Sequence, residues 1–256
     1  MTTMKTILND EIISVDKRLV ETFQRRSDIS GSTALIAIRL FHSNKLLVAN
    51  VGDSRGVLCD SKGATIPLSF DHKPYQLKEY RRILEAGGYI SLKGVYRVNG
   101  ILAISRALGD YPLKDNRLII PDPDILSFDL KELKPKFMIM ATDGFWDTFS
   151  NENAVQFVNN ELSRYKSNES NDVSSIALEI AKKLAKESYN RESYDNITVI
   201  VVLFDENNIY SKASSSMKSS PTKKTCSSNE FSSKNQQQQS SPLKPAIHEE
   251  CSSPSS

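Results

Sequence analysis

The stretch Leu46-Leu-Val-Ala-Asn-Val-Gly-Asp-Ser-Arg55 joins an apolar run directly to a Gly-Asp turn. The apolar residues predict a buried strand, and Gly52 with Asp53 marks the place where that strand ends. A second stretch, Phe137-Met-Ile-Met-Ala-Thr-Asp-Gly144, has the same construction and places Asp143 directly behind its apolar run. A carboxylate at a strand end is held rigidly, so both stretches indicate functional aspartates at the rim of a sheet.

Asp195 is a third aspartate of this kind, because it precedes the β-branched run Ile197–Phe204. Asp147 lies one helical turn beyond Asp143 and could add a fourth carboxylate. Carboxylates are hard oxygen ligands that suit Mg²⁺, Mn²⁺ or Ca²⁺ better than zinc. Taken singly, each Asp-Gly or Asp-Asn pair is also ordinary turn chemistry. Sequence spacing alone does not show that the carboxylates meet.

Charge and cysteine content exclude several functional classes. With 33 basic and 31 acidic residues, the net charge of +2 gives no electrostatic reason to expect nucleic acid or an anionic membrane as a partner. Three scattered cysteines argue against a disulfide framework and favour a reducing, cytoplasmic location. No apolar stretch approaches the roughly 18 residues that a membrane-spanning helix needs.

Composition divides the chain into a globular domain over residues 1–206 and a tail over residues 207–256. The tail is rich in Ser, Lys, Gln and Pro, and it includes the run Gln236–Gln239. Such a segment buries too little apolar surface to offset its chain entropy. We therefore predict that the tail is disordered.

Hydrophobic periodicity predicts a mixture of helices and strands in the globular domain. Apolar side chains at spacings of three and four predict a helix over residues 3–26 that ends at Ser30-Gly31, and residues 34–41 with 45–51 predict a β-hairpin. Further helices are predicted from Pro74 to Gly87, after a cap at Ser150, and over 173–189, with strands at 57–59, 95–97, 101–103, 137–141 and 197–204. Few connections look like parallel crossovers, so we expect the α+β class, with antiparallel sheets covered by helices.

Two other polar segments are weaker candidates for chemistry. His72, in Asp71-His-Lys-Pro74, is more typical of a loop histidine bonded to the backbone than of a catalyst. The run Gly31-Ser-Thr-Ala34 is too short to be a phosphate-binding loop with a helix behind it.

Eight short motifs occur in an order and spacing that resemble the PPM (type 2C) family of metal-dependent protein serine/threonine phosphatases, over roughly residues 10–204. They are Ser30-Gly-Ser-Thr-Ala34, Val48-Ala-Asn-Val-Gly-Asp-Ser-Arg55, Asp71-His-Lys-Pro74, Glu85-Ala-Gly-Gly88, Arg97-Val-Asn-Gly100, Ser105-Arg-Ala-Leu-Gly-Asp110, Asp143-Gly-Phe-Trp-Asp147 and Asp195-Asn-Ile-Thr198. The segments Val57–Asp60 and Ile120–Ile125 are most similar to the 1-like or epsilon branch of that family.

The resemblance implies a fold, a reaction and a set of metal ligands. The implied fold is a β-sandwich of two antiparallel sheets flanked by helices. Its cleft would hold two Mg²⁺ or Mn²⁺ ions that support hydrolysis of phosphoserine and phosphothreonine, so the implied partners are phosphorylated proteins. Asp143 and Asp195 match the family's ligands to one ion. Asp53, with Asp143 and Asp147, matches a more weakly held third site.

One part of the family pattern does not occur in these residues. Family members carry, ahead of the first helix, a phosphate-holding arginine, an acidic pair and an Asp-Gly-His-Gly-Gly motif whose aspartate bridges the two ions. Here no glycine precedes Gly31, and the histidines are His42, His72 and His248. We therefore expect a truncated domain without the first sandwich strands, as a splice form, a fragment or a truncated gene model. A longer form of the epsilon type could also carry a membrane anchor.

Two functions of different classes remain open. The first is a protein phosphatase whose full activity belongs to a complete form. The alternative is a non-catalytic binding or scaffold protein that keeps the fold without the chemistry. The absent ligand motif favours the alternative, whereas Asp53, Asp143 and Asp195, retained in register, favour the phosphatase unless the truncation is recent. The substrate protein and the oligomeric state have no signature in the sequence.

Overall fold

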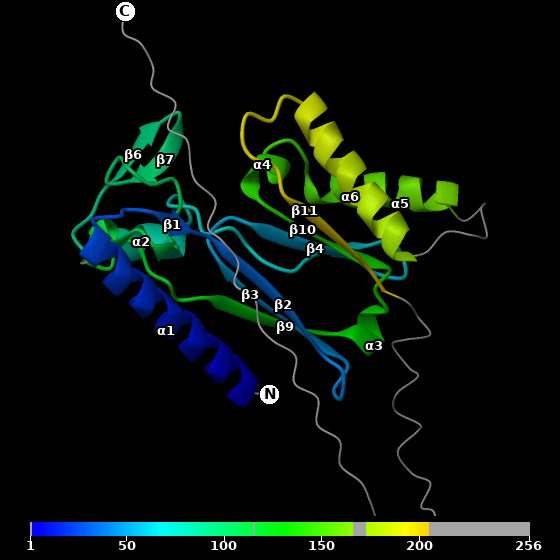
Figure 1. Ribbon diagram of the computed structural model, residues 1–256, viewed down its shortest axis with the longest axis horizontal. Helices are drawn as coiled ribbons and strands as arrows, with labels where there is room; N and C mark the ends of the chain where they lie inside the picture. The colour runs from blue at the N-terminus through cyan, green and yellow to red at the C-terminus, as the bar shows by residue number, and fades with distance from the viewer. Residues whose placement is uncertain (1, 115, 166–172, 205–256) are drawn as a thin grey trace, which may run out of the picture. The chain divides into compact units, whose positions relative to one another are not determined.

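The computed structural model describes residues 2–114, 116–165 and 173–204, which all belong to the first of two units, Met1–Ser216 and Met217–Ser256. The elements in chain order are α1 (Thr2–Arg26), β1 (Gly31–Ser32), β2 (Ala34–Leu40), β3 (Lys45–Val51), β4 (Arg55–Cys59), β5 (Thr65–Pro67), α2 (Leu77–Glu85), β6 (Ile90–Lys93), β7 (Val95–Val98), β8 (Leu108–Gly109), the 3₁₀ turn η1 (Tyr111–Leu113), β9 (Asp124–Asp129), α3 (Leu130–Leu133), β10 (Phe137–Ala141), α4 (Asp143–Trp146), α5 (Asn151–Tyr165), α6 (Val173–Asn190) and β11 (Val199–Leu203) (Figure 1). The expected tail over residues 207–256 lies outside the described residues, so both the tail and its boundary at 206 stay predictions.

The main strands form two antiparallel sheets, ordered β2-β3-β9 and β11-β10-β4-β5. Two short pairs, β1 with β8 and β6 with β7, are the other strand pairs in the described part of the chain. In the second sheet, Ala141 at the end of β10 lies opposite Val199 of β11 and Arg55 of β4. The expectation of a mixed α+β fold with antiparallel sheets is therefore confirmed.

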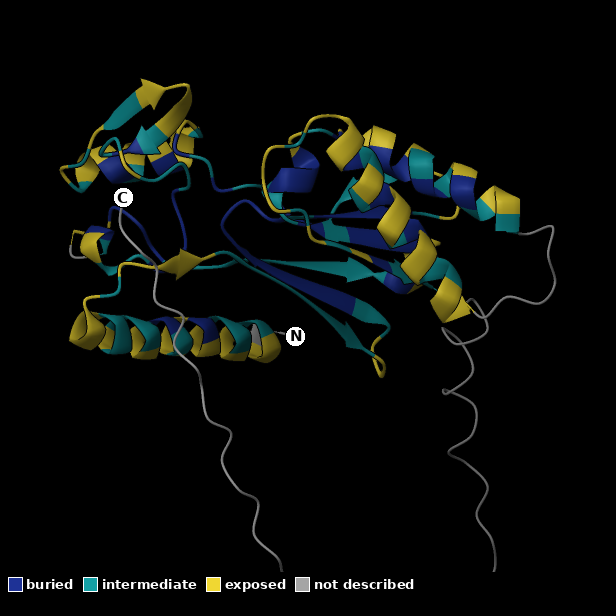
Figure 2. Ribbon diagram, turned by 45° about the horizontal axis from the view of Figure 1, so that its top comes forward, coloured by how far each residue is buried: buried dark blue, intermediate teal, exposed yellow. Residues whose placement is uncertain are grey.

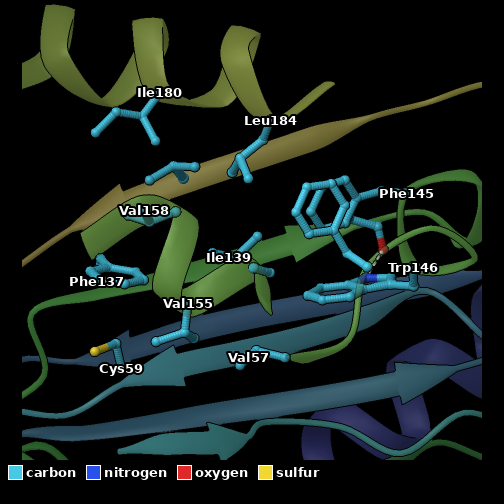
Figure 3. Packing of buried hydrophobic residues seen from close by; sticks show 14 residues of the cluster. Val57, Cys59, Phe137, Ile139, Phe145, Trp146, Val155, Val158, Ile180 and Leu184 are labelled. Carbon is cyan, nitrogen blue, oxygen red and sulfur yellow. Dashed lines mark hydrogen bonds between the residues drawn. The ribbon is translucent and has the colours of Figure 1, made fainter. Parts of the chain in front are cut away.

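The central strand β10 is apolar throughout because both of its faces are covered. Phe137 and Ile139 point toward α5 and α6, where the buried Ile180 and Leu184 sit one helical turn apart (Figure 3). Met138, on the opposite face, belongs to a second cluster that contains Leu46 and Val48 of β3 and Leu58 of β4, together with Leu68 and with Leu130 of α3. Each buried aliphatic side chain of this kind stabilises the fold by about 1.5–3 kcal/mol.

The first helix lies against the sheet that contains β3. Ile12 is buried in a cluster with Ala49 and Val51, and Figure 2 shows that one stripe of α1 is exposed while the other is covered. Asp16, also buried, accepts hydrogen bonds from Gly109 N at 2.8 Å and Lys114 Nζ at 2.5 Å. The helix predicted over residues 3–26 is confirmed, and it stops directly after Arg26, ahead of the expected stop at Ser30-Gly31. Ser27 takes a positive φ of 53°, which terminates the helix.

Two predicted elements need correction. The expected strand at 101–103 is wrong, because Leu102 makes only an isolated bridge to Val98, and β7 pairs instead with β6. Asn99 and Gly100 both have positive φ, so the chain turns too tightly there for a ladder. The helix expected from Pro74 begins at Leu77, after a turn in which Gln76 N bonds to Lys73 O at 3.1 Å. No described helix is long and apolar enough to cross a membrane.

Candidate metal centre

Asp143 and Asp195 are brought together by the pairing of β10 with β11. Beyond the last strand pair, Thr142 N donates to Thr198 O at 3.1 Å. Gly144 then packs so tightly that an added Cβ would lie 2.4 Å from the Asn196 carbonyl oxygen and 3.1 Å from Asp195 Cβ. The two aspartates predicted from separate strand ends therefore lie on adjoining segments.

Asp53 faces the same region from the end of β3. Its side chain and that of Asp143 line a cleft of about 310 Å³. Other polar residues that line this cleft are Ser32, Thr33, Ser54, Arg97, Asp110 and Thr142. Asp53 is only 5% exposed, so its negative charge needs compensation from a neighbouring cation or from hydrogen bonds.

The carboxylates influence one another electrostatically. Burial, followed by the charges of Asp53 and Asp195, raises the pKa of Asp143. Burial and then the charge of Asp143 likewise raise the pKa of Asp147. Mutual repulsion among buried carboxylates is relieved by a bound cation, and such perturbed groups in a cleft are typical of functional sites.

In this structure the carboxylates nevertheless do not close around a common point. Across residues 2–114, 116–165 and 173–204, no three His, Cys, Asp or Glu side chains are placed to hold a metal ion. Asp143 Oδ1 accepts from Gly144 N at 2.9 Å, and Asp195 Oδ1 accepts from Asn196 N at 2.6 Å. Asp53 Oδ2 accepts from Lys73 Nζ at 2.5 Å. The donor chemistry fits Mg²⁺ or Mn²⁺, and the assignment of Asp53, Asp143, Asp147 and Asp195 as ligands stays a prediction.

Three consecutive side chains hold the turn that carries Asp53. Asp71 pairs with Arg55 through two bonds, at 2.9 and 2.7 Å. His72 Nδ1 accepts from Gly52 N at 3.0 Å, and Lys73 reaches Asp53 itself. We refer to Asp71, His72 and Lys73 as the clasp.

The two ring nitrogens of His72 have different hydrogen-bond partners. His72 is 2% exposed, and its Nε2 lies 3.1 Å from Asp124 Oδ2. Since Nδ1 accepts a hydrogen bond from the backbone, Nε2 carries the proton and donates it to Asp124. The expectation of a loop histidine bonded to the backbone is confirmed.

A buried charge network beside this site had no counterpart in the sequence-based predictions. Arg106 is 3% exposed and pairs with Glu79 at 2.5 Å and with Asp124 at 3.0 Å. Arg82 contacts the other oxygen of Glu79 at 3.0 Å. Arg106 lies in a motif that carries the family resemblance, yet its partners are distant in sequence, and no periodicity links them.

Comparison with known proteins identifies the family. The chain matches the family described as protein phosphatase 2C over residues 3–197. It is 52% identical to protein phosphatase 1L from Bos taurus over 200 residues, which cover 78% of this chain and 52% of that protein. The chain therefore belongs to the protein phosphatase 2C family, and the expected likeness to the 1-like branch is confirmed.

Two further relatives support this assignment. Probable protein phosphatase 2C 11 from Arabidopsis thaliana is 40% identical over 211 residues, with 78% of this chain and 52% of the relative covered. The crystal structure of serine-threonine phosphatase 2C from Toxoplasma gondii matches with a TM-score of 0.65 and 25% identity, covering 79% of this chain and 67% of that one. The chain spans about half the length of the two curated relatives it matches here.

Proposed function

We propose that this chain carries part of the catalytic centre of a protein phosphatase that removes phosphate from phosphoserine and phosphothreonine in proteins. The observation that carries the proposal is that Asp53 and Asp143 line one cleft, where burial and then the charges of Asp53 and Asp195 raise the pKa of Asp143. Family membership supports the substrate class, because the relatives described above are protein phosphatases.

The proposed fold is the family's two-sheet β-sandwich without its first strands. In support, one buried cluster combines Leu46 and Val48 of β3 with Leu58 of β4 and Met138 of β10. Both β2 and β11 lie at sheet edges in the described part of the chain, so each has one side open to a further strand.

Asp143 and Asp195 would hold one divalent ion, and Asp53 with Asp143 and Asp147 would hold a weaker one. When bound, Mg²⁺ or Mn²⁺ supplies an activated water and positive charge for the phosphoryl oxygens. The residues of this chain fix the carboxylates: the β10–β11 pairing aligns Asp143 with Asp195, and the clasp orients Asp53. With divalent ions bound, the cleft would suit a phosphate group, and Arg97 adds a positive charge to its lining.

Activity of the 256-residue chain should be low, because it contains no Asp-Gly-His-Gly-Gly sequence. Changes to groups that only support the metal ligands typically cost about 10–100-fold, and the absence of ligands themselves should cost at least as much. The test is Mn²⁺-dependent turnover of p-nitrophenyl phosphate and a phosphothreonine peptide, beside bovine protein phosphatase 1L. Activity within about tenfold of that relative, abolished by Asp143→Asn, would mean that another group supplies the bridging ligand.

Metal binding gives a readout that does not require turnover. Calorimetric titration with Mn²⁺ should show weaker binding in Asp143→Asn, with Glu152→Gln on the exposed side of α5 as the control. An affinity unchanged by Asp143→Asn would contradict the ligand assignment.

The alternative, a non-catalytic binding or scaffold protein, is favoured by two specific observations. Asp53 is paired with Lys73, and no three potential ligands converge in the described residues. Specific binding of a phosphopeptide without metal-dependent turnover would support this alternative. The cytoplasmic location suggested by the few cysteines also remains a proposal, and fractionation of cells that express the chain would test it.

A further inference from the structure

The ion pair between Lys73 and Asp53 places a positive charge where the metal chemistry would require one. Lys73 Nζ lies 2.5 Å from Asp53 Oδ2, and the side chains are 23% and 6% exposed. A carboxylate buried this deeply is strongly destabilising unless a cation accompanies it. In this structure Lys73 is that cation.

The influence of Lys73 reaches beyond Asp53. Burial works against its charge, but the hydrogen bond and charge of Asp53, with the charges of Asp71 and Asp143, outweigh burial and raise the pKa of Lys73. The ammonium group therefore compensates the charge of Asp53 and is also attracted by the charges of Asp71 and Asp143.

We propose that Lys73 is a built-in counter-ion, and that a divalent ion must displace its ammonium group from Asp53 in order to bind there. The inference rests on the proposed role of Asp53 as a metal ligand. A metal–oxygen distance of about 2.0–2.6 Å would bring the ion within a few ångströms of the ammonium group, where the two positive charges repel one another.

The structure provides Lys73 with room to move. Its side chain is a flexible four-carbon stem, and about a quarter of it is open to solvent. Arg55, the other basic residue of the turn, cannot substitute for it, because Arg55 is held by Asp71 and by Asn151 at 3.0 Å. The clasp thus has two fixed members and one side chain that can leave.

Displacement makes Lys73 more reactive when metal binds. The purified 256-residue chain is treated with a limiting amount of an amine-acetylating reagent across a Mn²⁺ titration, and each lysine is quantified by mass spectrometry. We expect acetylation of Lys73 to rise several-fold, with the same midpoint as Mn²⁺ binding measured by calorimetry. Lys78, whose side chain is 79% exposed, is the internal control and should not change.

Two variants sharpen the test. The Lys73→Met variant should bind Mn²⁺ about tenfold more tightly, because Mn²⁺ no longer has to break the ion pair between Lys73 and Asp53. This factor corresponds to ~1.4 kcal/mol. Asp53→Asn should leave Lys73 reactive without metal, and Mn²⁺ should then raise its acetylation no further.

The outcomes separate the two proposals. If the unaltered chain binds no Mn²⁺, the metal-binding role and the displacement both fail. If the chain binds Mn²⁺ while Lys73 acetylation and the affinity of Lys73→Met stay unchanged, only the displacement is overturned. Weaker binding by Lys73→Met would also overturn it, because the lysine would then position Asp53 for the metal instead of competing with it.

Discussion

Replacing Glu79 by glutamine tests the buried charge network that supports the clasp. Glu79, on α2, is 1% exposed, and its carboxylate accepts hydrogen bonds from Arg106 and Arg82. Arg106 in turn holds Asp124, which accepts from His72. Glutamine has nearly the shape of glutamate and the charge of its protonated form, so the substitution removes the charge and little else.

The pKa of Glu79 sets the size of the effect. Burial alone would raise this pKa, but the hydrogen bonds and charges of Arg106 and Arg82 outweigh burial and lower it from 4.5 to about 2. A pKa lowered by folding stabilises the protein above the unfolded value, and that stabilisation is lost as the pH falls toward the folded value. The shift corresponds to ~3 kcal/mol at neutral pH and to less than half of that at about pH 3.

Urea unfolding followed by the fluorescence of Trp146, the single tryptophan of the chain, measures this difference. Glu79→Gln should lose ~3 kcal/mol of unfolding free energy at pH 7, and its deficit relative to the parent should shrink by more than half at about pH 3. Glu179→Gln is the matched control. Its pair with Lys182 is exposed, so it should change stability by less than about 1 kcal/mol. An equal deficit at both pH values would refute the electrostatic explanation.

Two further substitutions test the core and the strand-end contact. Phe145→Ala should cost about 3–5 kcal/mol in urea unfolding, because Phe145 is fully buried and stacks on Phe149 at 4.6 Å; a loss below about 1 kcal/mol would contradict this packing. Gly144→Ala should lower both stability and Mn²⁺ affinity, because its Cβ would meet the Asn196 carbonyl oxygen at 2.4 Å. Unchanged values for both measurements would show that the Asp143 and Asp195 segments do not depend on this close approach.

Elements with strong local patterns could be predicted from the sequence. The hairpin of β2 and β3 has two apolar runs and a short polar turn, and both strands form where those runs lie. The helix α5 follows its predicted cap, since Ser150 Oγ accepts from Asn153 N at 3.1 Å. These features depend on neighbouring residues, so local periodicity and capping rules suffice to find them.

Elements specified by distant partners were missed. The strand β9, Asp124–Asp129, contains polar residues among its apolar ones and does not alternate cleanly, because Ile125 and Leu126 are adjacent. It forms because β3 offers it an open edge, with Asn50 opposite Asp124 and Lys45 opposite Asp129. The pairing of β9 with β3 outweighs the weak strand propensity of these residues. Patterns among neighbouring residues do not reveal such a pairing.

The candidate site likewise contains residues with a local sequence signal and one residue without it. Its carboxylates could be found because each follows or precedes a recognisable apolar strand, and strand ends are where such groups are mounted. The counter-charge could not be found that way, because Lys73 reaches Asp53 across a loop of polar residues without periodicity. The burial of Asp53 nevertheless requires a positive charge beside it. A carboxylate that is 5% exposed needs a compensating positive charge, so a cleft that is proposed to bind a cation needs a substitute when no cation is bound. Within the clasp, Lys73 supplies this positive charge. A metal ion would have to break the ion pair between Lys73 and Asp53, so we expect Asp53 to bind a metal ion more weakly than an unpaired carboxylate would.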